Sequence, residues 1–337
     1  MKVYFRPLVQ CGPLRAPNAV SLAGGAMWFT HAVRLARGAA AVVVAADDVP
    51  ARVLARLTAP RAPVAGMTLD RPRLMGILNV TPDSFSDGGL FDAPEAALAQ
   101  ARRLAEAGAD MLDIGGESTR PGAVVVPEAT EITRTAPVIA AIRAGFSGPI
   151  SIDTRKAAVA RAALAAGADM VNDVSALGFD PAMAVLVATS GAPICLMHAQ
   201  GTPEVMQQAP AYDDVLLDVY DALAGHIDLA IAAGITRDRI VVDPGIGFGK
   251  TMQHNLALLA GLSLFHGLGC ALLLGASRKR FIGTLTGTET ARDRAAGSVG
   301  VALAAAAQGA QILRVHDMAD TRQALTLWAA AMNGDAA

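Results

Sequence analysis

The chain has little charge and few aromatic side chains, and this shortage bears on the classes of partner it can have. Only 17% of its 337 residues are charged, 4% are aromatic, and the formal net charge is −2. Such a balance argues against a surface built to bind nucleic acid, although a local basic pocket remains compatible with it. We therefore expect no nucleic-acid partner.

Long apolar runs are also missing, although 53% of the residues are hydrophobic. No run of roughly 18 apolar residues is free of charges and glycines, which disfavours a membrane span. The first ten residues turn polar before the core of a signal peptide could form. The three cysteines, Cys11, Cys195 and Cys270, do not have a metal-binding spacing. We expect reduced cysteines, no membrane partner and a cytoplasmic location.

A nucleotide-binding P-loop is absent as well, although DPGIGFGKT (243–251) resembles one. The P-loop pattern requires a glycine five residues before Gly249, and Pro244 stands there. Proline has no N–H group to offer a phosphate. The glycines are better explained as room for a sharp turn beside a flat ligand.

What is present, from about residue 74 onward, is a regular alternation of short apolar runs and longer amphipathic stretches. Eight strands are expected at 74–80, 111–116, 149–154, 170–175, 193–199, 240–246, 271–277 and 312–317, with helices such as 94–108 and 156–167 between them. Ala-Gly-Ala-Asp-Met occurs twice, at 107–111 and 166–170, each time leading into a strand. This count predicts a (β/α)₈ TIM barrel over 74–337. The alternative, an open doubly wound sheet, is disfavoured because no dinucleotide fingerprint follows the first strand.

Residues 1–73 have a different texture and predict a small N-terminal α+β extension of unknown role. Segments 3–9 and 40–48 resemble strands, and 27–38 resembles a short helix. Segment 58–73 carries prolines and charges, as a linker does.

Polar residues stand at the end of nearly every expected strand, where the active site of such a barrel lies. They are Asn79, Glu117, Ser118, Thr119, Arg120, Asp153, Asn172, His198, Asp243, Ser277, Arg278, Lys279, Arg314 and His316. Carboxylates such as Asp153 and Asp243 could accept the paired N–H groups of a 2-amino-pyrimidinone ring. Asn172 and Lys279 could bind the same heterocycle.

A second half of the ring suits an anion. Arg314 and His316 alternate on the last strand and so point to the same side. Arginine forms bidentate contacts with phosphate, and Asn79 could hold Mg²⁺ together with phosphate oxygens. Two Gly-, Pro- and Ser-rich loops, 81–92 and 117–127, could close over the site and exclude water.

Together these segments resemble the dihydropteroate synthase family over about residues 74 to 320. The matching stretches are MGILNVTPDSFSDGG (75–89), DIGGESTRPGA (113–123), SIDTRK (151–156), VNDVSA (171–176), LMHAQGTPEVMQ (196–207), DPGIGFGKTMQHN (243–255), LLGASRKRFIG (273–283) and ILRVHD (312–317). Ala199 departs from the pattern, which often has methionine there, and this trims the pocket wall.

The resemblance implies condensation of 6-hydroxymethyl-7,8-dihydropterin diphosphate with 4-aminobenzoate, giving 7,8-dihydropteroate and pyrophosphate. It implies pterin binding by Asp153, Asn172, Asp243 and Lys279, diphosphate binding by Asn79, Arg314 and His316, Mg²⁺ binding by Asn79, and an aminobenzoate site at Phe85, Thr119, Arg120, Pro121, Ser277 and Arg278. Asp87, Arg120 and Lys279 are expected to take part in catalysis. The family's enzymes are sulfonamide targets and usually homodimers, which predicts the same here.

Two rival functions remain open at this point. A pterin-dependent methyltransferase would share Asp153, Asn172 and Asp243 but would have no use for Arg314 and His316. A non-catalytic pterin-binding protein would be favoured by loss of loop residues, and the loops are complete.

Overall fold

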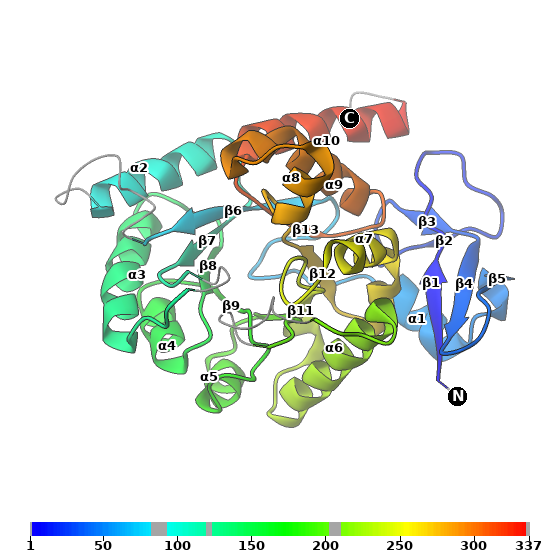
Figure 1. Cartoon of the computed structure of the whole chain (residues 1–337), viewed down its shortest axis with the longest axis horizontal. Helices are drawn as coiled ribbons and strands as arrows, with labels where there is room; N and C mark the ends of the chain where they lie inside the picture. Colours follow the sequence, from blue (N-terminus) through cyan, green and yellow to red (C-terminus); the bar gives the residue numbers. More distant parts are fainter. Residues whose placement is uncertain (1, 82–92, 119–122, 202–209, 335–337) are drawn as a thin grey trace.

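A closed barrel of parallel strands forms most of the chain (Figure 1). The computed structural model describes residues 2–81, 93–118, 123–201 and 210–334. The barrel strands are β6 (Arg73–Asn79), β7 (Met111–Gly115), β8 (Ile150–Asp153), β9 (Met170–Asp173), β10 (Ile194–Met197), β11 (Ile240–Asp243), β12 (Ala271–Leu274) and β13 (Ile312–Val315). Pairing of β13 with β6 closes the sheet. The (β/α)₈ prediction is confirmed and the open-sheet alternative is wrong.

Helices follow the strands and cover the outside of the barrel (Figure 1). They are α2 (Ala93–Glu106), α3 (Glu128–Arg143), α4 (Ala157–Ala165), α5 (Ala182–Ser190), α6 (Val215–Ala232), α7 (Met252–Ala260), α8 (Arg280–Thr286), α9 (Ala295–Ala306) and α10 (Met318–Asn333). The expected helices at 94–108 and 156–167 correspond to α2 and α4, each ending shortly before a glycine with positive φ, Gly108 or Gly167.

The internal repeat serves one structural purpose twice. Asp110 accepts the backbone N–H of Leu74 at 2.8 Å, and Asp169 accepts that of Ile150 at 2.8 Å. An arginine pairs with each of these carboxylates, Arg322 with Asp110 and Arg143 with Asp169. Each repeat therefore anchors the start of the preceding strand to a helix.

The half of the barrel interior at the N-terminal ends of the strands, called the floor below, is apolar. Side chains from seven of the eight strands form one cluster there: Met75, Met111, Met170, Cys195, Val241, Ala271, Leu273 and Ile312. Val64 and Met67 belong to the same cluster, and their backbones bond to each other across a turn at Ala65 and Gly66. The segment expected to be a linker thus also plugs the barrel floor.

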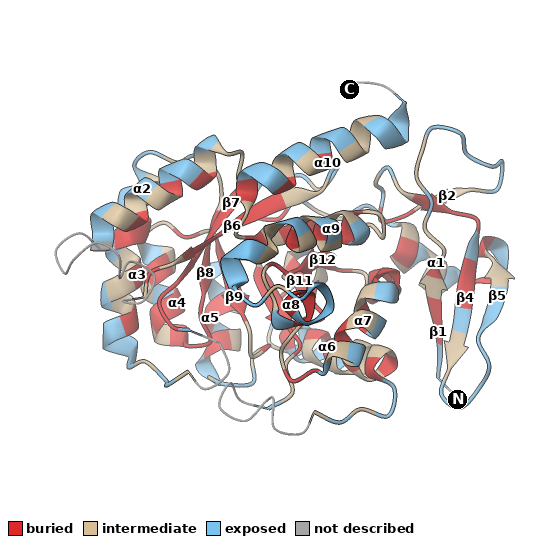
Figure 2. Ribbon diagram, turned by 45° about the horizontal axis from the view of Figure 1, so that its top comes forward, coloured by how far each residue is buried: buried red, intermediate tan, exposed pale blue. Residues whose placement is uncertain are grey.

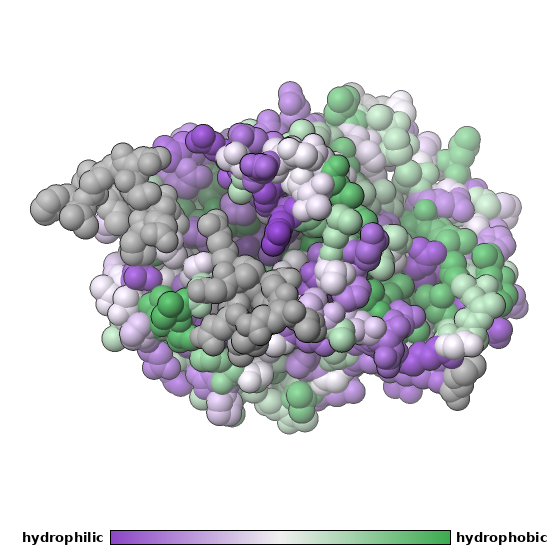
Figure 3. Space-filling model, in the orientation of Figure 1, coloured by the Kyte–Doolittle hydropathy of each residue, from purple (hydrophilic) through white to green (hydrophobic). Residues whose placement is uncertain are grey.

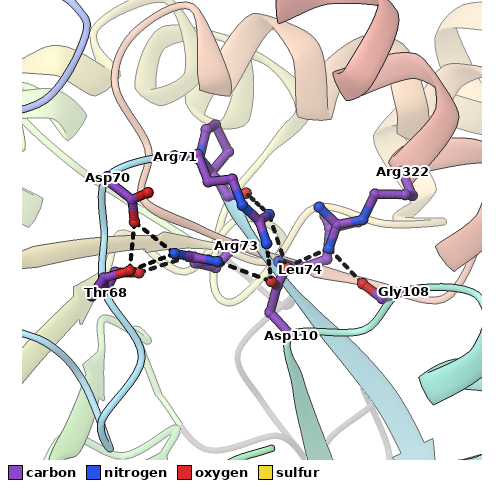
Figure 4. A network of polar contacts seen from close by, with 9 residues as sticks. Thr68, Asp70, Arg71, Arg73, Leu74, Gly108, Asp110 and Arg322 are labelled. Atoms are coloured by element: carbon purple, nitrogen blue, oxygen red, sulfur yellow. Dashed lines mark hydrogen bonds and ion pairs between the residues drawn. The ribbon is translucent and has the colours of Figure 1, made fainter. Parts of the chain in front are cut away.

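Hydrogen-bonded ion pairs hold the rest of that segment in place (Figure 4). Asp110 accepts hydrogen bonds from Arg71 at 2.5 Å and from Arg73 at 3.2 Å, and it also pairs with Arg322 of α10. Arg73 in turn reaches Asp70 at 2.6 Å. The segment before β6 is therefore bound to both the first αβ turn and the last helix.

The extension is a separate small layer beside the barrel (Figures 1 and 2). Its antiparallel sheet has the order β1-β4-β5, from β1 (Val3–Pro7), β4 (His31–Ala36) and β5 (Val42–Ala45), and β2 (Val20–Ser21) pairs with β3 (Trp28–Phe29). Helix α1 (Ala51–Thr58) completes a core that includes Phe5, Leu22, Phe29 and Leu57. The boundary at residue 73 stays a prediction, and β6 begins there.

The helix expected at 27–38 is wrong, because this segment forms β3 and β4. Phe29 and Ala32, three residues apart, are both fully buried, which imitates a helical period. The segment is extended because β4 has a strand on each side, with Val33 opposite Arg6 of β1 and Val43 of β5. Tertiary pairing outweighs the weak local preference.

Charged contacts join the extension to α6. Asp221 accepts from Lys2 at 2.6 Å, from Tyr4 at 2.7 Å and from Arg37 at 2.9 Å. The Ser263 hydroxyl donates to the Pro7 carbonyl at 2.9 Å.

In the part of the chain that the structure describes, no helix is both long and apolar enough to cross a membrane.

Candidate active site

Polar side chains occupy the barrel interior directly above the apolar floor. Successive side chains of a strand alternate in direction, so a residue two positions after a floor residue points inward one level higher. This places Asp113 above Met111, Asn172 above Met170, Asp243 above Val241 and Arg314 above Ile312. Asn79 and Asp153 end β6 and β8.

Arg314 is the centre of this layer. Its Nε donates to Asp113 Oδ2 at 2.6 Å and its Nη2 donates to Asp153 Oδ2 at 2.7 Å. Asn172 Nδ2 donates to the same oxygen of Asp113 at 3.2 Å. One guanidinium therefore bridges two buried carboxylates and leaves the amide of Asn172 beside them.

Asp113 is a site residue that sequence reasoning missed, because it lies within an expected strand rather than at its end. Its side chain is fully buried. The other oxygen of each bridged carboxylate, Asp113 Oδ1 and Asp153 Oδ1, is buried with no hydrogen-bond partner among the described residues. Such acceptors are costly to bury unless a ligand supplies donors.

Burial disturbs the protonation of these carboxyls. Burial, and next the charge of Asp113, raise the pKa of Asp153, against the opposing charge of Arg314. Burial raises the pKa of Asp243 to about 6, and the hydrogen bond from the Gly245 N–H opposes the shift. Near neutral pH Asp243 is therefore mostly ionised, whereas Asp153 is partly protonated, and in either form each group keeps an oxygen that can accept a donor from a ligand.

Two glycines lie directly against these carboxylates. A Cβ at Gly115 would lie 3.5 Å from the Asp153 Cβ and 3.6 Å from Asn79 Oδ1. A Cβ at Gly275 would lie 3.5 Å from Asp243 Oδ2 and 3.7 Å from the Arg314 side chain. A larger residue at either place would intrude on the polar layer.

The turn after Asp243 carries the next site residue. Asp243 Oδ1 accepts the Gly245 N–H at 2.7 Å. The Lys279 ammonium lies 3.8 Å from the centre of the Phe248 ring, a cation–π arrangement. Phe248, another residue that the sequence did not single out, brings the turn of 244–250 against Lys279.

The ends of β12 and β13 are joined by two contacts. Ser277 Oγ lies 3.1 Å from His316 Nδ1 and accepts the His316 N–H at 3.2 Å. Arg278 has φ of +59°, and its guanidinium forms two hydrogen bonds with the Asp317 carboxylate. Ser277 and His316 are thus brought together, whereas the guanidinium of Arg278 is committed to the start of α10.

Glu117 belongs to a buried ion cluster rather than to the central layer. Its carboxylate accepts from Arg155 at 3.0 Å, from Lys156 at 2.6 Å and from the Val126 N–H at 2.7 Å. Lys156 also reaches Glu131 at 2.5 Å. Glu117 and Val126 are held together by this cluster.

The described residues offer little for a protein-only metal site. Among them no group of three or more His, Cys, Asp or Glu side chains is arranged to hold a metal ion. Asn79, the last residue of β6, presents one neutral oxygen at the rim. This donor set fits a Mg²⁺ ion whose other ligands are phosphate oxygens and water.

Five predicted site residues lie outside the described residues: Phe85, Asp87, Thr119, Arg120 and Pro121. The others are placed as reported above. In Figure 3 strongly hydrophilic residues gather in a hollow near the middle of the molecule. Polar groups are thus concentrated in the hollow of this face.

Comparison with known proteins gives one consistent result. The model of the family "Pterin binding enzyme" matches residues 75–316. A dihydropteroate synthase of Neisseria meningitidis serogroup B is 49% identical over 267 residues, which are 78% of this chain and 93% of that protein.

Solved structures agree. A dihydropteroate synthase of Xanthomonas albilineans with 4-aminobenzoic acid is 52% identical with a TM-score of 0.76, covering 81% of this chain and 98% of that one. The Yersinia pestis enzyme, solved as a sulfonamide drug complex, is 46% identical with a TM-score of 0.76, covering 80% and 98%. The whole extension lies outside the family match, which begins at residue 75.

Proposed function

The chain belongs to the pterin-binding enzyme family and is a dihydropteroate synthase, and on that premise we propose how its own residues perform the reaction. The enzyme condenses 6-hydroxymethyl-7,8-dihydropterin diphosphate with 4-aminobenzoate and releases 7,8-dihydropteroate and pyrophosphate. It is a transferase of folate biosynthesis and, as the drug complex of its relative supports, a sulfonamide target.

The observation that carries the proposal is the group of buried carboxylates in the polar layer, two of whose oxygens, Asp113 Oδ1 and Asp153 Oδ1, have no donor among the described residues. The pterin ring presents adjacent N–H donors on its 2-amino-pyrimidinone edge, and Asp153 and Asp243 face the interior with carboxylates that can accept them. Asn172 supplies a donor and an acceptor to the same ring. The Lys279 ammonium donates to the ring carbonyl or a ring nitrogen.

The diphosphate would extend from the ring toward Asn79, Arg314 and His316. A guanidinium has five N–H donors, and the contacts with Asp113 and Asp153 use two of them. Arg314 can therefore serve a phosphate oxygen without releasing either carboxylate. His316 lies beside it, two residues along and at the end of the same strand.

Asn79 is proposed to hold Mg²⁺ together with diphosphate oxygens. The chemistry that this ion supplies is neutralisation of the charge that accumulates on the leaving group. The aminobenzoate site is proposed to lie toward Ser277, with Phe85, Asp87, Thr119, Arg120 and Pro121 completing it.

The bond changes need few protein groups. The C–O bond at the pterin methylene breaks, and its electron pair leaves with pyrophosphate, whose charge Arg314 and His316 stabilise. The ring, held by Asp153, Asp243 and Asn172, disperses the positive charge on the methylene carbon. The amine of 4-aminobenzoate then forms the C–N bond and loses one proton to solvent, and no general base is required because an arylamine is neutral near pH 7.

We further propose a cytoplasmic homodimer. The support for the location is that all three cysteines are free thiols, and the support for the dimer is the family resemblance.

The decisive experiment incubates the purified chain with Mg²⁺ and both substrates and measures dihydropteroate and pyrophosphate. Product should form only when both substrates are present, and a chelator should stop turnover. Pterin binding without product would instead favour the methyltransferase or the non-catalytic interpretation.

A further inference from the structure

Lys250, the lysine of the P-loop-like stretch, is buried without a carboxylate partner. The side chain lies in the interior, with only 3% of the residue exposed. Among the described residues, no acidic group within 4.0 Å pairs with it, whereas the other buried lysine, Lys156, contacts Glu117 and Glu131. A buried ammonium without a counter-ion is expensive and needs a specific reason.

Burial lowers the pKa of Lys250 to about 7, and the charge of Asp243 opposes the shift, so the ammonium is the main form below that pH. Three acceptors surround this ammonium and match its three hydrogens. Lys250 Nζ donates to the Phe248 carbonyl at 2.9 Å and to the His198 carbonyl at 3.2 Å, and it lies 2.9 Å from His198 Nδ1. Burial and the charge of Lys250 lower the pKa of His198 to about 3, so the ring is neutral and Nδ1 can accept. The ammonium thus ties the turn after β11 to the end of β10.

The two segments it ties are in close backbone contact. Gly245 and Gly249 both have positive φ. A Cβ at Gly245 would lie 1.9 Å from the His198 carbonyl oxygen, and a Cβ at Gly249 would lie 2.4 Å from the Gln200 carbonyl oxygen. The Gly247 N–H donates to Asn255 Oδ1 at 2.7 Å and the Tyr212 hydroxyl donates to the Gly249 carbonyl at 2.8 Å. Lys250 adds a third tie, through the Phe248 carbonyl.

Phe248 connects the tie to the pterin site. The centre of its ring lies 3.8 Å from the Lys279 ammonium, and a Cβ at Gly247 would lie 3.1 Å from Lys279 Cδ. Moving the turn would move both the ring and the space that Lys279 occupies. The chain of contacts runs from Lys250 to Phe248 and then to Lys279.

We propose that Lys250 is a positioning residue of the pterin site, which sets the place of the Lys279 ammonium by holding the 244–250 turn against His198. The inference rests on the proposed function, because it assigns a role within the pterin pocket. Lys250 itself does not touch the substrate.

The test uses the full chain and measures binding of the dihydropterin diphosphate by calorimetry, together with KM for each substrate and kcat. Lys250→Met keeps the length and removes all three donors. It should weaken pterin binding about tenfold to a hundredfold, the usual effect of losing hydrogen bonds to a charged group. KM for 4-aminobenzoate should stay within about twofold.

A double-mutant cycle separates positioning from a general structural effect. If Lys250 acts through Lys279, adding Lys250→Met to Lys279→Met should weaken pterin binding by less than about threefold more. Lys250→Gln, which keeps two N–H donors, should recover part of the affinity. Lys2→Met, at a lysine whose side chain is 57% exposed, is the matched control and should change nothing.

Three results would overturn the inference: unchanged pterin affinity in Lys250→Met, an equal loss in the Lys279→Met background, or an equal rise in both KM values. If Lys250→Met does not fold, Phe248→Leu in the same cycle tests the link to Lys279, and additive losses there would contradict it. Failure of the proposed function is distinguishable, because the unchanged chain would then bind pterin without forming product. If the unchanged chain binds no pterin, both the function and the inference fall.

Discussion

Substitution of Asp243 by asparagine should stabilise the ligand-free protein while weakening pterin binding. The Asp243 carboxylate is buried, and burial raises its pKa to about 6. Asparagine keeps an oxygen that can accept the Gly245 N–H, which Asp243 accepts at 2.7 Å. The substitution therefore removes mainly the buried charge.

The sign and size follow from linkage. Because the folded-state pKa exceeds the ordinary value near 3.8, the folded protein binds more protons than the unfolded chain between about pH 4 and 6. Stability due to this group therefore falls as the pH rises through that window. A shift of about two pKa units corresponds to roughly 3 kcal/mol of unfolding free energy, and this contribution is fully lost by about pH 7. Asp243→Asn should remove this loss, so its advantage over the unchanged chain should grow from pH 4 to 7.

Urea unfolding at half-unit steps from pH 4.5 to 7.5, without ligand, measures the difference between the two proteins. A pterin titration over the same range should show affinity of the unchanged chain falling as the pH drops and Asp153 and Asp243 take up protons, and the variant should bind weakly at every pH. A difference in unfolding free energy that does not vary with pH would refute the reasoning, as would tight pterin binding by the variant.

Three further outcomes are expected. Arg278→Ala and Asp317→Asn should each raise KM for the diphosphate substrate, and their effects should not add because both break the same ion pair. A rise in KM for 4-aminobenzoate in Arg278→Ala alone would instead indicate that Arg278 contacts this substrate directly. Asp113→Asn should lower the raised pKa of Asp153, because the Asp113 charge raises it, and so move the acid limb of the kcat/KM profile to lower pH; an unmoved limb would contradict the coupling. Leu57→Ala should cost the extension about 2–5 kcal/mol by opening its core, seen as faster hydrogen exchange in residues 2–60 while kcat is retained; loss of kcat would mean that the extension supports the site.

The barrel was predictable because each of its strands is a short buried run, and β6, β8, β9 and β11 end in a polar residue. Asp153 and Asp243 end β8 and β11, as the sequence indicated. In the extension the same method failed at 27–38, because Phe29 and Ala32 are spaced like a helix but are buried by strand pairing. Pairing partners that are distant along the chain cannot be read from a local period.

Asp113 could have been found from the internal repeat. Aligning 107–114 with 166–173 places Asp113 opposite Asn172, two residues after Met111 and Met170. Both side chains rise from the apolar floor into the polar layer, where they contact each other at 3.2 Å. The roles of Lys250 and Arg278, in contrast, depend on partners in other elements, and no local pattern in the sequence indicated those partners.

The buried charges of this barrel show why its site is poised for a ligand rather than for stability. Asp113, Asp153 and Asp243 place three carboxyls in the interior, where the charges of Arg314, Lys279 and Lys250 act on them. Two of the carboxyl oxygens have no donor among the described residues. Replacing such groups by neutral ones commonly stabilises a protein at the expense of activity. A pterin ring carries the N–H donors that these oxygens lack, so its binding would recover free energy that folding alone leaves unfavourable.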